Sequence, residues 1–158
     1  MCKAIGSIFL LFTAFFYSSK RQKTEKQKIR ILTELRELIL HIRKNIECFA
    51  KPLGEICRDY TSPALEQIGF HLLWRSGRLQ EAVSCLNEYV CPQACKVLQR
   101  YAQEAGQGYK EEELRLCGYT ADMLSEILQK EEGELNSRTK LYRTLPYLLA
   151  LSLVLVLY

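Results

Sequence analysis

The chain has 158 residues, with 22 Lys and Arg against 18 Asp and Glu, and a formal net charge of +4 at pH 7. This length accommodates one modest domain with its own core and leaves no room for a second. Six basic residues gather between positions 20 and 30, and from Ile31 onward 15 basic and 17 acidic residues leave a net charge of −2. Because nucleic-acid binding needs a basic face to neutralise phosphates, the composition argues against a nucleic-acid partner.

The chain begins and ends with uncharged apolar runs, residues 4–17 and 145–158, of 14 residues each. As a helix, 14 residues cover about 21 Å, against roughly 30 Å for the hydrocarbon core of a bilayer. Snorkelling of flanking Lys3 and Lys20 lengthens the first run, and both are predicted to be transmembrane anchors, residues 1–19 and 144–158. The alternatives are a cleavable signal peptide for the first run and a buried or surface-lying helix for the second.

A basic collar follows the first run. It consists of Lys20, Arg21, Lys23, Lys26, Lys28 and Arg30. Four more basic residues, Lys130, Arg138, Lys140 and Arg143, precede the second run. The positive-inside tendency then predicts that the part between the anchors faces the cytoplasm, with the collar on anionic lipid.

From residue 23 to 50 the apolar residues recur at alternating steps of three and four, which predicts one amphipathic helix. Its stripe is Leu32, Leu35, Ile39, Ile42, Ile46 and Phe49. The helix could be continuous with the first anchor. Pro52 is expected to end it, since proline disfavours helical geometry in the residue before it.

The middle of the chain predicts several short helices, over residues 53–60, 64–74, 79–90 and 92–105, with a long last helix that leads into the second anchor. Ser62 and Pro63 read as a helix N-cap and first turn, and glycines at 77, 106 and 108 read as breaks. No segment of this part has the two-residue alternation of a strand. The expected fold is therefore all-α, a small cytosolic helical bundle over residues 31–143 flanked by the two transmembrane helices.

Seven cysteines occur without a regular framework: Cys2, Cys48, Cys57, Cys85, Cys91, Cys95 and Cys117. In a cytoplasmic segment they are expected to be reduced thiols packed in the core. Cys91 and Cys95 are four residues apart and could share a helix face, but a zinc site needs two more ligands at a suitable spacing. His71, beside an apolar stretch, is expected to be a packed ring.

Phosphate loops, dinucleotide fingerprints and nucleophile elbows are absent from the sequence, so we assign no catalytic, cofactor-binding or metal-binding residues. Two acidic runs could contact a partner protein. They are Glu111, Glu112 and Glu113, and Glu131 with Glu132. The first run is also explained by the helix dipole, which favours negative charge at a helix start, and the second by a solvated face.

Local matches along most of the chain resemble the stage III sporulation protein AB family. They are Lys3 and Gly6 in the first apolar run, Ile29-Arg30 with residues 32–39, Pro52-Leu53, the aromatic-to-glycine turn of residues 101–106, and residues 140–145 before the apolar tail. The resemblance implies a cytosolic domain similar to those of the type II secretion inner-membrane platform protein.

The resemblance further implies a non-enzymatic platform in the mother-cell membrane of a sporulating bacterium. It would couple a secretion-type ATPase to a channel complex between mother cell and forespore. The expected partners are this ATPase, other channel components and membrane lipid, with no cofactor, nucleic acid or small-molecule substrate. The alternatives are a membrane-tethered regulatory or adaptor protein unrelated to secretion, and a thiol or metal enzyme built on Cys91 and Cys95.

Overall fold

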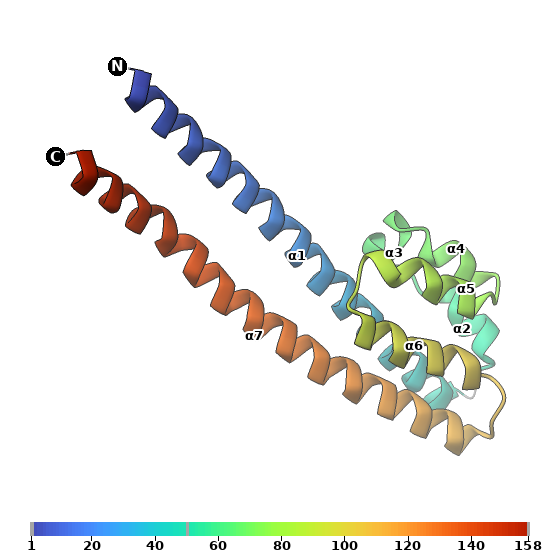
Figure 1. The fold of residues 1–158 in the computed structure, drawn as a ribbon. Helices are drawn as coiled ribbons and strands as arrows, with labels where there is room; N and C mark the ends of the chain where they lie inside the picture. Colours follow the sequence, from blue (N-terminus) through green and yellow to red (C-terminus); the bar gives the residue numbers. More distant parts are fainter. Residues whose placement is uncertain (1, 50, 158) are drawn as a thin grey trace. The chain divides into compact units, whose positions relative to one another are not determined.

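The computed structural model describes the backbone of residues 2–49 and 51–157 and the side chains of residues 23–49 and 51–138. All regular structure in these residues is helical, which confirms the all-α prediction (Figure 1). The helices are α1 (Cys2–Phe49), α2 (Leu53–Asp59), α3 (Pro63–Gln67), α4 (Phe70–Arg75), α5 (Leu79–Ser84), the 3₁₀ helix η1 (Cys85–Glu88), α6 (Pro92–Glu104) and α7 (Lys110–Leu157).

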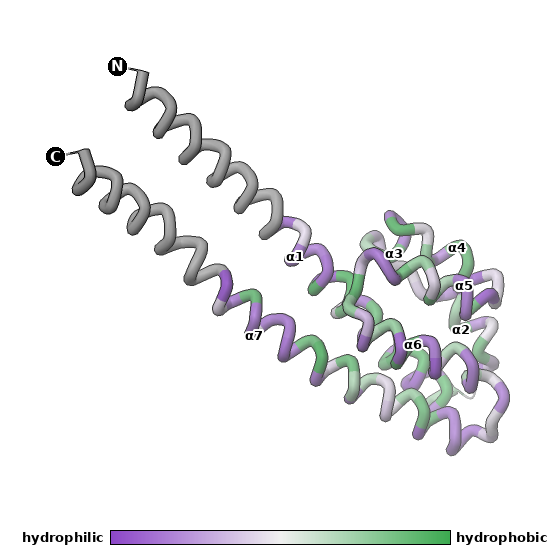
Figure 2. Tube along the Cα trace, viewed as in Figure 1, coloured by the Kyte–Doolittle hydropathy of each residue, from purple (hydrophilic) through white to green (hydrophobic). Residues whose placement is uncertain are grey.

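The chain divides into two compact units, and the core described here lies in the unit formed by residues 28–130. The other unit comprises residues 1–27 and 131–158. Figure 2 shows hydrophobic and hydrophilic residues interleaved along the described parts of α1 and α7. This interleaving is typical of helices that bury one face and expose the other.

The apolar stripe of α1 is buried as predicted at Leu35, Ile39 and Ile42. Two further buried residues, Ile31 and Leu38, widen this face beyond the predicted stripe. Phe49, the last residue of the predicted stripe, is not buried: it is 66% exposed. It is the last residue of α1, where the helix offers no following turn to cover the ring.

Pro63 and Pro92 lie at helix starts, as predicted, and Pro52, expected only to end the preceding helix, also begins one. The Pro52 carbonyl accepts hydrogen bonds from the amides of Glu55 and Ile56, at 3.0 and 3.3 Å, and so opens α2. Pro63 and Pro92 occupy the first turns of α3 and α6. Proline suits this place because the first helical amide has no partner within the helix.

Two of the helices predicted as continuous are each divided into two helices in the structure. The helix expected over residues 64–74 is two helices, α3 and α4, because Gly69 adopts φ +74°, a left-handed conformation that breaks the helix. The helix expected over residues 79–90 is α5 followed by η1, a tightening of the last turn that is common at helix ends.

Aromatic rings fill the core between α4 and α6. Trp74 stacks on Phe70 at 5.1 Å between ring centroids and on Tyr101 of α6 at 6.4 Å. All three are buried. The Tyr101 hydroxyl lies 3.8 Å from the sulfur of Cys117, which connects α6 to α7.

The described residues contain no helix that is long and apolar enough to cross a membrane. The predicted anchors lie outside the residues whose side chains the structure describes, and the described backbone of residues 2–19 and 144–157 is helical. Lys20 and Arg21 of the basic collar also lie outside the residues with described side chains, whereas Lys23, Lys26 and Arg30 are exposed.

Candidate functional site

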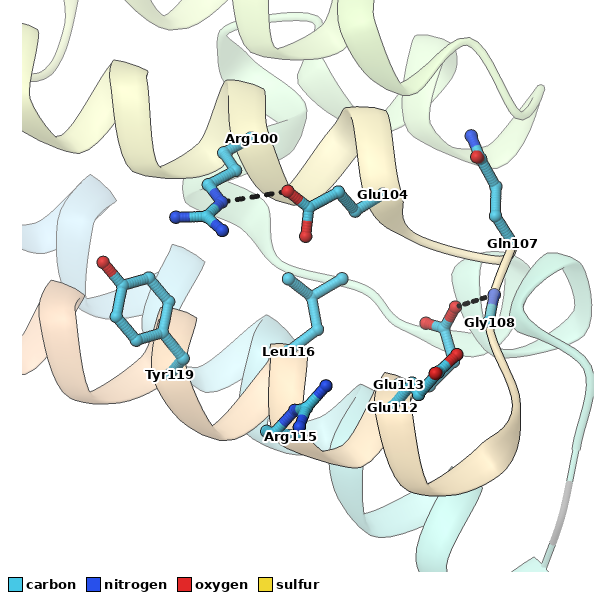
Figure 3. Close-up of a pocket in the computed structure, with 9 residues that line it drawn as sticks. All are labelled: Arg100, Glu104, Gln107, Gly108, Glu112, Glu113, Arg115, Leu116 and Tyr119. Carbon is cyan, nitrogen blue, oxygen red and sulfur yellow. Dashed lines mark hydrogen bonds and ion pairs between the residues drawn. The ribbon is translucent and has the colours of Figure 1, made fainter.

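The start of α7 and the loop that joins α6 to it form one side of a groove of about 560 Å³. Figure 3 shows the side chains that line this groove. They are Arg100, Glu104, Gln107, Gly108, Glu112, Glu113, Arg115, Leu116 and Tyr119. The lining is dominated by charged groups, with Leu116 and Tyr119 as its apolar part.

Two carboxylates hold the α6–α7 loop at one end of the groove. Glu113 Oε1 accepts hydrogen bonds from the backbone amides of Gly106 at 2.7 Å and Gly108 at 3.2 Å. Glu112 Oε2 accepts one from the amide of Tyr109 at 3.2 Å, as in a capping box. Position 106 favours glycine because its φ is +80°, a left-handed conformation that other residues rarely adopt. Glu112 and Glu113 of the first acidic run therefore pair backbone amides of the loop that leads into α7.

An arginine is held at the other end of the groove. Arg100 Nε donates to Glu104 Oε1 at 2.9 Å, and the Arg100 guanidinium carbon lies 5.6 Å from the centroid of the Tyr119 ring. The ion pair joins two exposed side chains of α6, whereas the ring belongs to α7. This end thus combines a carboxylate and an aromatic face around a cation.

The predicted partner-contact residues have different environments. Glu111 is exposed and lies outside the groove lining, whereas Glu112 and Glu113 line the groove and bind the loop. Glu113 is only 8% exposed. Glu131, half-buried, and Glu132, exposed, belong to the other unit. Whether these residues contact a partner stays a prediction.

Sequence analysis missed Arg100, Glu104 and Tyr119. The four-residue spacing of Arg100 and Glu104 on a predicted helix is a signal for an ion pair. No comparable signal connects Arg100 to Tyr119, because their approach depends on how α6 and α7 pack.

The core-packing prediction for cysteines is confirmed for Cys57, Cys95 and Cys117, which are buried in the hydrophobic core. It is wrong for Cys48 and Cys85, which are exposed, and Cys91 is half-buried. Burial raises the pKa of the Cys57 thiol to about 11 and also raises the pKa values of Cys95 and Cys117. Such thiols are poor nucleophiles and poor metal ligands, because both roles need the thiolate. Among the described residues, no group of three or more His, Cys, Asp or Glu side chains is arranged so that it could hold a metal ion.

His71 is a packed ring, as predicted. It is buried, and its Nε2 accepts a hydrogen bond from the amide of Ser62 at 2.8 Å. The Ser62 hydroxyl makes no cap to α3, contrary to the expected N-cap hydrogen bond. Burial lowers the pKa of His71, with the Arg75 charge adding to the shift, which favours the neutral ring.

The helices and the groove together define a small helical-bundle protein whose candidate site is a charged surface groove. The family model for stage III sporulation protein AB matches residues 3–158. The chain therefore belongs to the stage III sporulation protein AB family, as its sequence motifs indicated, and this family points to a role in sporulation. No curated protein and no solved structure matches the chain significantly.

Proposed function

We propose that the chain is a non-enzymatic platform, anchored in the membrane, that couples a cytosolic secretion-type ATPase to a channel complex during sporulation. The observation that carries the proposal is the family match over residues 3–158, nearly the whole chain. The bundle has one small core, in which Cys57 and His71 are buried and packed, and this supports a binding role over a catalytic one.

The two uncharged runs at the ends of the chain support membrane anchoring. Residues 4–17 and 145–158 carry no charge, and the basic collar follows the first run directly. Each basic residue near an anionic leaflet contributes about 1 kcal/mol of attraction, so the collar would hold the protein at the cytoplasmic face of the mother-cell membrane. The helical bundle would then face the cytoplasm.

The charged surface of the bundle supports a protein partner. Glu111 and Glu132 are exposed, and Glu131 is half-buried, so these three remain candidates for contacts with the ATPase. Glu112 and Glu113 already bind the α6–α7 loop, so reversing their charge would also disturb the fold. A test of the acidic runs should therefore reverse residues 111, 131 and 132 only.

The proposal is tested by gene disruption together with co-purification. Disruption should block sporulation after engulfment, and the tagged full-length protein should co-purify with the ATPase from detergent-solubilised membranes of sporulating cells. The Glu111→Lys, Glu131→Lys and Glu132→Lys variant should retain less ATPase, with a loss that depends on salt. Normal sporulation after disruption would contradict the sporulation role, and an unmutated protein that retains no ATPase would contradict the platform role.

A further inference from the structure

The two walls of the groove carry opposite charges at the same level. Arg100 of α6 lies across from Tyr119 of α7, and this contact sets which residues of the two helices stand level (Figure 3). The chain reverses at the loop between α6 and α7, so the two helices run antiparallel (Figure 1). Glu104 is one turn nearer the loop than Arg100, and Arg115 is one turn nearer the loop than Tyr119. A glutamate on one wall is therefore level with an arginine on the other.

The same opposition recurs one turn further from the loop, beyond the groove lining. Lys96 follows Arg100 along the exposed face of α6, and Asp122 follows Tyr119 along the exposed face of α7. Both are exposed. Within the described part of the chain, no ion pair includes Lys96, Arg115 or Asp122. These three charges are therefore available to another molecule.

This order of charges is complementary to itself. In a two-fold symmetric dimer, a contact from one residue to another is repeated in the reverse direction. When a second copy faces the groove about a two-fold axis that runs along it, α6 of each copy lies over α7 of the other. Glu104 then meets Arg115 of the second copy, and Lys96 meets Asp122 of the second copy. From this we propose that the α6–α7 groove is the interface of a dimer of this chain.

The centre of the groove suits such an interface. Tyr119 is 48% exposed, and Leu116 beside it is half-buried, so the two supply an apolar patch between the charges. Aromatic residues and arginine are enriched at the core of protein interfaces. Glu104 is also within reach of a second copy, because its side chain is 49% exposed and only its Oε1 is bonded to Arg100.

The charge order favours a second copy over an unrelated protein. An unrelated segment would have to carry an acid and a base in matching positions, whereas a second copy brings them by symmetry. Charge complementarity of this kind sets the register and the choice of partner more than the affinity. The inference goes beyond the proposed function, because dimerisation through this groove requires neither an ATPase nor a channel.

The test uses two full-length copies with different affinity tags, expressed together and solubilised in detergent. One tag is captured, and the amount of the second copy that it retains is measured by immunoblotting. The parent copies should co-purify. If they do not, the inference is overturned and the groove is left to a different protein.

Charge reversal then locates the interface. Lys96→Glu places two acids opposite each other at both contacts, and Asp122→Lys places two lysines there. Each variant expressed only with itself should retain about tenfold less of the second copy, because like charges across an interface are strongly unfavourable. The two variants expressed together restore opposite charges at both contacts and should recover retention to within about twofold of the parent. Glu66→Lys on α3, outside the groove, should change retention by less than about twofold.

Each result decides between arrangements. Full retention in both single variants would show that the copies associate elsewhere, and loss in both without recovery in the mixture would contradict the two-fold register. Both positions are exposed and lack ion pairs, so the variants should fold, as circular dichroism checks. If either fails to fold, Arg115→Glu with Glu104→Lys applies the same test at the loop end of the groove, with the same outcomes.

Discussion

The amide of Ser62 donates a hydrogen bond to Nε2 of His71 at 2.8 Å inside the core, and this bond joins the start of α3 to α4. The ring must be neutral to accept it. Burial lowers the pKa of His71, and Arg75 lowers it further, while Glu66 and the Ser62 hydrogen bond act in the opposite direction. Protonation would turn the acceptor into a second donor facing the Ser62 amide.

This bond predicts a loss of stability in mild acid. The unfolded histidine titrates near pH 6.5, whereas the folded one titrates lower, so below about pH 6.5 the unfolded state binds more protons and stability falls as the pH falls. The melting temperature of the full chain should therefore decrease between about pH 7 and pH 5.5. His71→Gln retains an acceptor and should lessen this decrease. An unchanged pH profile in the variant would contradict the assignment.

The buried face of α1 predicts the effect of a charge at Ile39, which is fully buried. Ile39→Asp should destabilise the protein by several kcal/mol, because it buries a carboxylate without a partner. Glu37→Lys is the matched control, since the Glu37 side chain is 52% exposed and its ion pair with Arg36 contributes at most about 1 kcal/mol. Thermal unfolding followed by circular dichroism measures both, and comparable losses would show that the face is wrongly assigned.

The aromatic stack predicts a contrast between two residues of α4. Trp74→Ala should cost about 3–5 kcal/mol, because it leaves a large cavity between Phe70 and Tyr101. Leu72 is 79% exposed, so Leu72→Ala should stay within about 0.5 kcal/mol of the parent. Chemical denaturation gives both values, and a small effect of Trp74→Ala would mean that this stack contributes little to the core.

The break between α3 and α4 predicts opposite effects for two glycines that both have open space around an added Cβ. Gly69→Ala should destabilise by about 1–2 kcal/mol, because alanine is strained at φ +74°. Gly54, inside α2, has no such φ, and Gly54→Ala should stabilise by about 0.4–1 kcal/mol. If both substitutions shifted the denaturation midpoint in the same direction, the left-handed geometry at Gly69 would be in doubt.

The proposed topology predicts where an impermeant thiol reagent reaches the chain. In a cysteine-depleted background, Tyr109→Cys places a thiol at a position that is 86% exposed in the bundle. It should be labelled only after the cells are permeabilised, whereas a cysteine added after Tyr158 should be labelled in intact cells. Labelling of Tyr109→Cys in intact cells would exclude a cytoplasmic bundle.

The sequence alone determined the helical class, the buried residues Leu35, Ile39 and Ile42, and the helix starts at Pro63 and Pro92. These features depend on local rules, namely the 3.6-residue period of a helix and the missing amide of proline. The family resemblance also came from residues along the chain, and the family model bears it out.

Only the tertiary structure decided where helices break within an apolar pattern and which side chains meet across helices. Gly69 could have continued a helix, and its left-handed φ accompanies the packing of His71 and Trp74 into the core. The groove joins Arg100 to Tyr119, on separate helices, and turns Glu113 from an expected surface charge into a buried loop anchor. Such contacts depend on the packing of α6 against α7, which no local spacing specifies.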